Sequence, residues 1–415
     1  MEKDYRLGQI FRRWGESYIA KWQPAGVVCR TLRAIASCRT QVLGGIEVLC
    51  KSCGCVHRVY ASCGNRNCPI CPALKKEIWL MKRQEALLPV KYYHVVFTLP
   101  SELDILCKNH PRILYNILFR SAWQSLKMML EDGKWCGARS GMLSILHTWG
   151  QNLSFHPHLH CIVPAGGLSF DQQSWVGAKK SKVLVDVMEL SKLFRVTFMN
   201  QLRTYWEFKG IDFRGSARRY EDIEVWRALF ASVDKAWVVH TSSPDCGAHQ
   251  TLNYLSRYTH AVAISEYRIL EVGEQSVQIQ YKDYADEAEN GLPKKKTMEL
   301  KGMDFIQRFV QHILPKGFQK IRYYGIWAPC NGQRYLKKCQ QLLKQVVYKQ
   351  SLQAIKALVK QKMGVVSGCC KYCQSQTIVT KVLVQNPIKG LYKANQLRIS
   401  RSPPKIVRSQ HLLHF

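Results

Sequence analysis

The sequence predicts an α+β fold, and three observations support this. The central part of the chain alternates helix-like and strand-like segments, without the glycine-rich phosphate-binding loop of a nucleotide-binding α/β domain. A strand-like run of alternating histidines lies inside that part, and a cysteine-rich stretch with few long apolar runs precedes it. With 415 residues, the chain is long enough for two or three domains. We expect a small metal-stabilised domain at 1–90, an α+β domain at 91–325 and a basic C-terminal region at 326–415.

The individual elements follow from their residue patterns. Leucine and isoleucine among charged residues predict a helix over 73–88. The β-branched and aromatic run at 92–99 ends at Pro100 and predicts a buried strand. The later patterns predict a helix at 111–130, strands at 142–148 and 158–163, helices at 187–207 and 222–231, a strand at 236–241, a helix at 247–259, strands at 262–271 and 276–282, a loop at 283–296, and helices at 303–313 and 333–363.

The charge of the chain is strongly positive and unevenly placed. There are 61 Lys and Arg against 29 Asp and Glu, for a formal net charge of +32. Residues 305–415 contain 20 Lys or Arg and no acidic residue. A polyphosphate backbone suits such a tract, because it attracts the cations and releases its counterions when they bind. We therefore expect a nucleic-acid partner.

No membrane partner is expected, and the cysteines are expected to be reduced. No run of apolar residues is long enough to span a bilayer, and no strongly amphipathic basic helix with an aromatic face is evident. The N-terminus is charged and no apolar signal segment follows it, so we expect a cytosolic protein with reduced thiols. The 17 cysteines are then metal ligands or packed thiols rather than disulfides.

Two CxxC pairs predict a zinc site near the N-terminus. Cys50 and Cys53 form the first pair, and Cys68 and Cys71 form the second, with 14 residues between them. Each pair can supply two thiolates from a tight turn, and four thiolates complete the tetrahedral shell of a structural zinc. We expect these four cysteines to form a zinc ribbon.

Further cysteines lie inside and beside this cluster. Cys38 and Cys63, with Cys55, are candidates for a second zinc, although packed thiols are the alternative. The CxxC formed by Cys369, Cys370 and Cys373 has no second pair close to it in the sequence, so packing or a remnant is the favoured interpretation there, with a zinc site as the alternative. Because Arg66 and other cations surround the N-terminal cluster, we expect that module to contact DNA, with a purely structural clip as the alternative.

The histidine run predicts a second, chemically different metal site. His158 and His160 alternate on a strand, so their imidazoles point to one face and can converge on one cation. If the strands at 142–148 and 158–163 pair as a hairpin whose turn lies between Asn152 and Leu153, His147 lies opposite His158. His147 is therefore the favoured third ligand. Gln151 and His156 are the alternatives.

A pair of tyrosines four residues apart suggests the reaction. On a helix, Tyr254 and Tyr258 share a face. Such pairs usually pack in a core, but here they accompany a metal site on a basic chain. A phenolate can attack a phosphodiester to give a 5′-phosphotyrosine and a free 3′-hydroxyl, and a cation can neutralise charge in that step. Two tyrosines allow two successive transfers.

Together these residues resemble the IS91 family of rolling-circle transposases, which belongs to the HUH endonuclease superfamily. The resemblance covers roughly residues 30–345. The stretches that carry it are CRTQVLGG (38–45), CKSCG (50–54), SCGNRNCPIC (62–71), YYHVVFTLP (92–100), HTWGQNLSFHPHLH (147–160), YLSRYTHAVAIS (254–265), YKDYAD (281–286) and FIQRFVQHILPKGFQKIRYYG (305–325).

The resemblance implies a fold, a reaction and the residues for it. The fold is an HUH-type central antiparallel sheet with flanking helices, preceded by a zinc-ribbon-like domain and followed by a basic, mostly helical region. The reaction is nicking and joining of single-stranded DNA at insertion-sequence ends with Mg²⁺ or Mn²⁺, beside structural Zn²⁺. The HUH motif matches His158 and His160, and the tyrosine motif matches Tyr254 and Tyr258. Arg257, between the tyrosines, is expected to contact DNA, and a cytoplasmic, nucleoid-associated bacterial location follows.

The sequence departs from the family at four positions. Ile46 and Asn67 stand where members often have histidines, which weakens the case for a second N-terminal zinc. Ala261 and Glu266 replace a common arginine and asparagine, which lowers the expected DNA affinity there. Some relatives use one tyrosine, the one that matches Tyr258. The competing hypotheses are a replication initiator or relaxase with the same chemistry, and a catalytically decayed zinc-dependent DNA-binding protein.

Overall fold

The computed structural model describes most of the chain. The described residues are 5–179, 183–208, 210–242, 258–259, 261–287, 293–330, 332–345, 353, 357, 370, 372–373, 375 and 378–383. Tyr254, Arg257 and nearly all of the helix expected at 247–259 lie outside them. Among the described residues, no helix is both long and apolar enough to cross a membrane.

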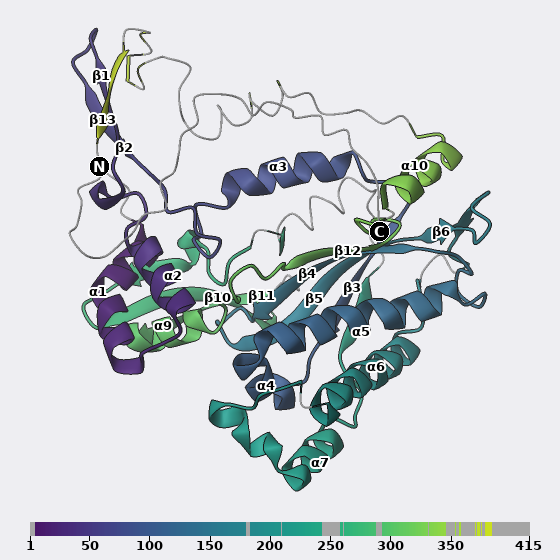
Figure 1. Cartoon of the computed structure of the whole chain (residues 1–415). Helices are drawn as coiled ribbons and strands as arrows, with labels where there is room; N and C mark the ends of the chain where they lie inside the picture. The colour runs from purple at the N-terminus through teal and green to yellow at the C-terminus, as the bar shows by residue number, and fades with distance from the viewer. Residues whose placement is uncertain are drawn as a thin grey trace, which may run out of the picture.

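A five-stranded antiparallel sheet forms the centre of the molecule (Figure 1). Its order is β12-β4-β5-β3-β8, and every neighbouring pair runs antiparallel. The strands are β3 (Tyr92–Thr98), β4 (Gly141–Trp149), β5 (Phe155–Pro164), β8 (Val239–Ser242) and β12 (Ile321–Gly325). This sheet, with its helices and the cysteine-rich N-terminal region, confirms the expected α+β class.

Helices cover one face of the sheet, as Figure 1 shows. Alternate strand residues such as Phe97 and Leu159 are fully buried on this face, packed with Phe119 and Phe194 of the helices. The Phe97 and Phe194 rings meet edge to face with centroids 5.0 Å apart. The covering helices are α4 (Asp104–Asn109), α5 (Pro111–Glu131), α6 (Val187–Glu207) and α7 (Ile223–Ser232).

The opposite face carries a smaller apolar group and the polar residues of interest. Tyr92, Leu143, Ile145 and Ile162 are buried there. Trp79 packs on them from α3 (Ala73–Gln84), a helix that lies across the sheet from α5 and α6 (Figure 1). One face of the sheet is thus a continuous hydrophobic core, whereas the other leaves room for a site.

The N-terminal helices share a core with a segment far along the chain. These are α1 (Arg6–Trp22) and α2 (Gly26–Ala36), and both pack beside α9 (Gly302–Val310) and the sheet of β9 (Ile269–Val272), β10 (Ser276–Glu287) and β11 (Pro293–Lys301). Phe11 and Phe309 meet edge to face with centroids 5.1 Å apart. The N-terminal region is therefore stabilised by buried apolar side chains as well as by its cysteines.

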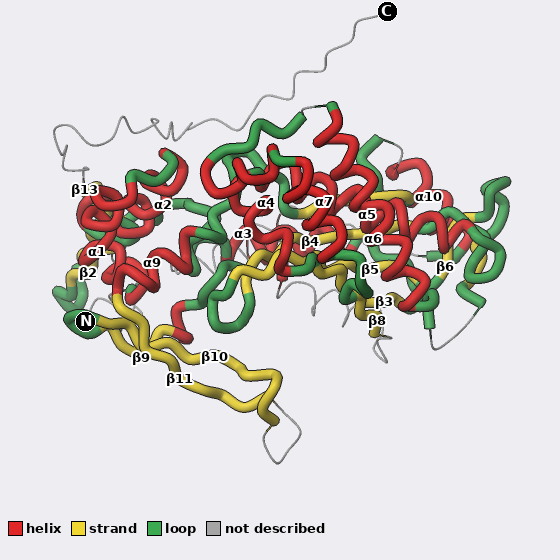
Figure 2. Tube along the Cα trace, turned by 90° about the horizontal axis from the view of Figure 1, so that it is seen from below, coloured by secondary structure: helices red, strands yellow, loops and turns green. Residues whose placement is uncertain are grey.

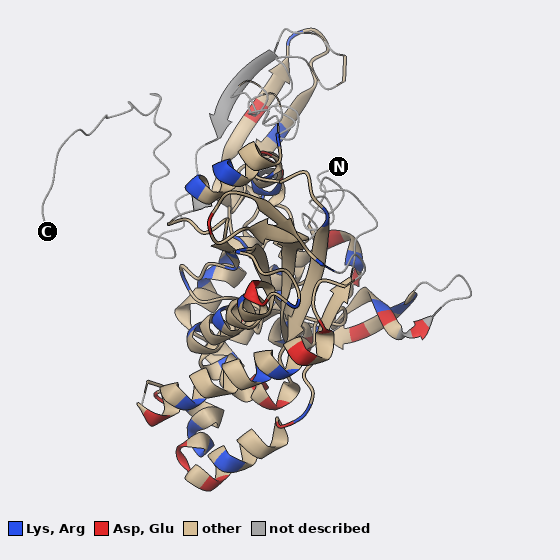
Figure 3. Cartoon of the chain, turned by 90° about the vertical axis from the view of Figure 1, so that its right-hand side faces the viewer, with Lys and Arg blue, Asp and Glu red and all other residues tan. Residues whose placement is uncertain are grey.

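The loop expected at 283–296 is wrong, because β10 and β11 extend through most of it. These strands form a ribbon that projects from the molecule (Figure 2) and carries side chains of both charges (Figure 3). Lys296 Nζ lies 2.8 Å from a carboxylate oxygen of Asp283 and 2.9 Å from one of Asp286. A polar sequence is typical of a loop, but on an exposed ribbon polar side chains can also pair across neighbouring strands.

A second small sheet joins the two ends of the chain. It consists of β1 (Gly45–Cys50) and β2 (Val56–Tyr60), with β13 (Ile378–Leu383) on the other side of β1. The C-terminal region was expected to be mostly helical, but its described part contains this strand as well as α10 (Gly332–Leu342). The remaining short elements are η1 (Gln41–Leu43), η2 (Ser101–Leu103), η3 (Gly215–Glu221), η4 (Glu266–Arg268), β6 (Gly166–Leu168) and β7 (Trp175–Gly177).

Candidate active site and metal centres

Three histidines converge on the open face of the central sheet. Strands β4 and β5 pair so that His147 lies directly opposite His158, as the turn position predicted. The turn is tight: Leu153 adopts φ +62°, and the Asn152 side chain accepts a hydrogen bond from the Ser154 amide. His160 lies two residues beyond His158 on the same face, and the ligand atoms of these three histidines all lie within 4.8 Å of one another.

The nitrogen positions fit a divalent cation. His158 Nε2 and His160 Nε2 are 3.1 Å apart. Two cis ligands that each lie about 2.1 Å from an octahedral cation are about 3.0 Å apart. His158 Nδ1–H donates to the His156 carbonyl at 2.7 Å, which leaves the Nε2 lone pair for a cation. No carboxylate joins the three histidines in the part of the chain that the structure describes.

Burial keeps these histidines neutral. It lowers the pKa of His158 to about 4 and holds the pKa values of His147 and His160 well below their usual range. Nearby histidines lower them further, because two imidazolium charges repel each other. A neutral imidazole is the form that binds a metal ion.

His94 belongs to the histidine group, and the sequence analysis did not select it. It lies on β3 beside β5, and its Nε2 is 3.0 Å from Nδ1 of His160. The two rings stack with centroids 5.2 Å apart. If His160 Nδ1–H donates to His94, the Nε2 lone pair of His160 is free for a cation. The available signal was a single histidine in the apolar run of 92–99.

Tyr258 lies directly on the histidine group. Its ring stacks on that of His160 with centroids 4.0 Å apart and planes 26° apart. His147 Nε2–H donates to the Tyr258 backbone carbonyl at 2.9 Å, so His147 carries its lone pair on Nδ1. Trp149 also stacks on His147, with centroids 4.4 Å apart. The fold therefore positions one predicted tyrosine against two of the three predicted histidines, His147 and His160.

The cysteines form two groups of four, and neither is the ribbon expected from the sequence. In the first group, Cys38 joins Cys63, Cys68 and Cys71. The Sγ–Sγ distances are 3.6 Å for Cys38–Cys71, 3.5 Å for Cys63–Cys71 and 3.8 Å for Cys38–Cys68. Four sulfurs about 2.3 Å from a tetrahedral zinc are about 3.8 Å apart, so this group fits zinc.

The second group corrects both expectations for the CxxC pairs. Cys50 and Cys53 do not meet Cys68 and Cys71; they meet the C-terminal cysteines, Cys370 and Cys373, instead. The β1–β2 hairpin carries the first pair away from the second. Each CxxC is a local turn, so its spacing shows that a pair can bind metal but not which other pair completes the site.

Comparisons with known proteins identify a zinc-binding region and a transposase region in the chain. Residues 10–99 match a family described as "Transposase zinc-binding domain", and residues 141–334 match one described as "Putative transposase". A protein of Sinorhizobium fredii named "Putative transposase y4qJ" is 38% identical over 81% of this chain and 84% of its own length. The chain belongs to the IS91 family of transposases.

A second relative extends the match. The transposase for insertion sequence element IS801 of Pseudomonas savastanoi is 28% identical over 87% of this chain and 85% of its own length. No solved structure matches the chain significantly. As a transposase, the protein acts on DNA as a cleaving and joining enzyme, and its N-terminal region binds structural zinc.

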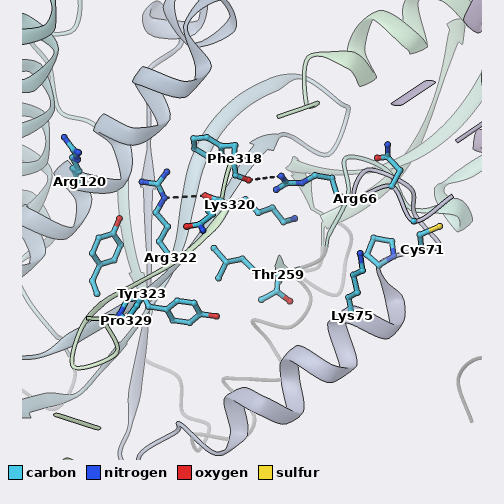
Figure 4. A pocket seen from close by; sticks show the side chains of 16 residues that line it. Arg66, Cys71, Lys75, Arg120, Thr259, Phe318, Lys320, Arg322, Tyr323 and Pro329 are labelled. Atoms are coloured by element: carbon cyan, nitrogen blue, oxygen red, sulfur yellow. Dashed lines mark hydrogen bonds between the residues drawn. The ribbon is translucent and has the colours of Figure 1, made fainter. Parts of the chain in front are cut away.

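The transposase has a basic pocket beside the tyrosine (Figure 4). Its volume is about 740 Å³, and Thr259, the residue after Tyr258, lines it. One wall belongs to the zinc-binding region and another to β12. The cations in its lining are Arg66, Lys75, Arg120, Lys320 and Arg322, and none of the described residues that line it is acidic.

Three of these cations are tied to the protein. Arg66 donates to the Phe318 carbonyl at 2.7 Å, and Lys320 donates to the Ala261 carbonyl at 2.9 Å. Arg322 donates to the side-chain oxygen of Asn116 at 2.5 Å. Burial, followed by the charge of Arg66, lowers the pKa of Lys320 to about 7. The structure thus places Arg66, one of the two predicted DNA contacts, in the pocket lining.

Proposed function

We propose that this transposase nicks and rejoins single-stranded DNA at insertion-sequence ends through a 5′-phosphotyrosine on Tyr258, in rolling-circle-type transposition. The observation that carries the proposal is the stacking of Tyr258 on His160 at the edge of a basic pocket. A nucleophile, a cation-binding group and a phosphate-binding surface therefore lie together. The family membership favours transposition over a replication initiator or relaxase with the same chemistry.

His147, His158 and His160 would hold Mg²⁺ or Mn²⁺. When bound there, the cation would supply charge neutralisation for the scissile phosphate and the phenolate. The protein's own groups prepare the site: the His156 carbonyl holds the proton on Nδ1 of His158, and His94 holds the proton on Nδ1 of His160. Both histidines then present Nε2 to the same point.

The covalent step conserves the phosphodiester energy. Tyr258 loses its phenolic proton, and its oxygen forms a bond to phosphorus while the bond between phosphorus and the 3′-oxygen breaks. The 3′-oxygen takes up a proton and leaves as a hydroxyl. A 3′-hydroxyl of a second strand reverses these steps and releases the tyrosine. We assign a second transfer to Tyr254 and a DNA contact to Arg257.

The pocket favours single-stranded over duplex DNA as the ligand. Its lining combines five cations with the aromatic rings of Phe318, Tyr323 and Tyr324. Proteins that bind single strands use cations for the backbone and aromatic rings for stacking unpaired bases. Arg120 on α5 is exposed and available to a phosphate.

A covalent-adduct assay tests this function. The full-length protein is incubated with Mn²⁺ and single-stranded DNA from the flanks of its gene, and the products are separated under denaturing conditions. We expect a protein–DNA adduct on the peptide that contains Tyr258, and its loss in Tyr258→Phe with DNA binding retained. Tyr267→Phe is the matched control, because Tyr267 is 77% exposed and lies outside the site. An undiminished adduct in Tyr258→Phe would contradict the assignment.

A further inference from the structure

The two ends of the chain meet at the second group of cysteines. Cys50 and Cys53 lie at the turn of the β1–β2 hairpin, whereas Cys370 and Cys373 precede β13. Cys50 Sγ is 3.6 Å from Cys373 Sγ, and Cys53 Sγ is 3.6 Å from Cys370 Sγ. The two contacts therefore join residues that are more than 300 positions apart. The C-terminal pair lies outside both matched family regions.

The distances distinguish a metal site from disulfides. A disulfide brings two sulfurs to about 2.0 Å, whereas the sulfurs of a tetrahedral zinc site are about 3.8 Å apart. Both measured distances agree with the second value. Four cysteines without an oxygen or nitrogen ligand select a soft, tetrahedral cation such as Zn²⁺ over the Mg²⁺ or Mn²⁺ that suits the histidine site.

Described backbone amides in both cysteine pairs are consistent with metal-binding turns. Gly54, directly after the first pair, adopts φ +70°, and its amide donates to the Cys50 carbonyl at 2.9 Å. The Tyr372 amide points to Cys370 Sγ at 3.4 Å. Cys50 and Cys370 are buried, at 2% and 1% exposure.

The surrounding backbone is built around the same junction. Strand β13 pairs antiparallel with β1 over six residues, from Gly45 opposite Leu383 to Cys50 opposite Ile378. The Ser52 and Ser375 hydroxyls lie 2.7 Å apart between the two turns. A two-stranded hairpin is only marginally stable alone, so a third strand fixed by a metal ion stabilises it. Figure 1 shows β13 beside β1 and β2, at the end of the molecule opposite α10.

We propose that Cys50, Cys53, Cys370 and Cys373 bind a second structural Zn²⁺ that clamps the C-terminal segment to the N-terminal zinc-binding region. This site is separate from the first cysteine group, which lies within residues 38–71. It closes the chain into a loop that contains the whole nuclease sheet.

Zinc counting on the full-length protein tests the clamp. Native mass spectrometry under reducing conditions should give two zinc ions per wild-type chain and one in Cys370→Ser/Cys373→Ser. Cys50→Ser should lose the same ion, because both ends of the chain supply one site. Cys55→Ser is the matched control and should keep two ions, since Cys55 lies on the same hairpin but outside both groups.

Two further measurements distinguish loss of the zinc site from misfolding of the variant and from disulfide formation. Cys373→His should keep the second zinc, because histidine replaces a thiolate in such sites. Hydrogen exchange of 378–383 should speed up in the double serine variant and stay slow in Cys373→His. One zinc in the wild type, two zinc ions in the double serine variant, or, without reductant, a mass lower by two hydrogens for each disulfide formed would overturn the proposal.

Discussion

His94 offers the most informative test of the histidine site, because it acts on a ligand without being one. Its Nε2 is the partner of His160 Nδ1 at 3.0 Å, and both side chains are buried, at 7% and 9% exposure. Replacing His94 with Phe keeps an aromatic ring of similar size but removes the acceptor. The Nδ1–H of His160 is then buried without that partner.

The size of the effect follows from that lost hydrogen bond. Leaving a buried donor unsatisfied costs about 1–3 kcal/mol. The His160 ring can avoid this cost by moving its proton to Nε2, but it then loses the lone pair that binds the cation. Loss of such a supporting partner typically weakens metal binding by about 10–100-fold. We therefore expect the Mn²⁺ dissociation constant of His94→Phe to rise by that factor.

Mn²⁺ titrations followed by electron paramagnetic resonance measure this constant directly, and adduct formation against Mn²⁺ concentration gives the kinetic counterpart. In His94→Phe the half-saturating Mn²⁺ concentration should rise while the rate at saturation changes little. His94→Gln should restore most of the affinity, because its amide oxygen can accept the same hydrogen bond. Unchanged Mn²⁺ affinity in His94→Phe, or a lower saturated rate with unchanged affinity, would refute the positioning role.

Three other predictions concern the pocket and the first zinc group. Arg120→Gln should weaken single-stranded DNA binding and reduce the slope of log affinity against log salt by about one. The control Arg227→Gln, on α7, should change neither quantity. An unchanged slope in Arg120→Gln would contradict a phosphate contact at Arg120. In the folded protein the pKa of Lys320 is about 7, whereas its ordinary value is 10.5. At pH values between these two, Lys320 is protonated in the unfolded chain but not in the folded chain. Between pH 7 and pH 10, the free energy of unfolding of the wild type should therefore rise relative to that of Lys320→Met by about 1.4 kcal/mol per pH unit. Chemical denaturation measures both free energies. A difference that does not change with pH would show that Lys320 stays charged in the folded protein. Cys68→Ser should remove one zinc ion and lower the melting temperature, because Cys68 is 1% exposed within the N-terminal core. The control Cys330→Ser, at an exposed thiol, should do neither. Two zinc ions retained in Cys68→Ser would exclude Cys68 as a ligand.

Where structure depends on neighbours in the chain, the sequence was a good guide. Helix α6 spans the predicted residues, because its apolar side chains recur at helical spacing over 21 residues. The position of His147 opposite His158 also followed from the sequence, since a hairpin with a known turn has only one register. The polar tip of β10 and β11 was missed because its charged pattern suits a loop as well as an exposed ribbon.

The sequence by itself determined the basic charge, the α+β class, the histidine pair on one strand and the metal-binding nature of the CxxC turns. Only the tertiary structure decided which CxxC pairs combine, that His94 on a neighbouring strand supports His160, and that the pocket cations gather beside Tyr258. The physical reason is the range of the interactions. A turn or a strand face is set by adjacent residues, whereas a four-sulfur site or a stacked ring needs the whole chain to bring distant segments together.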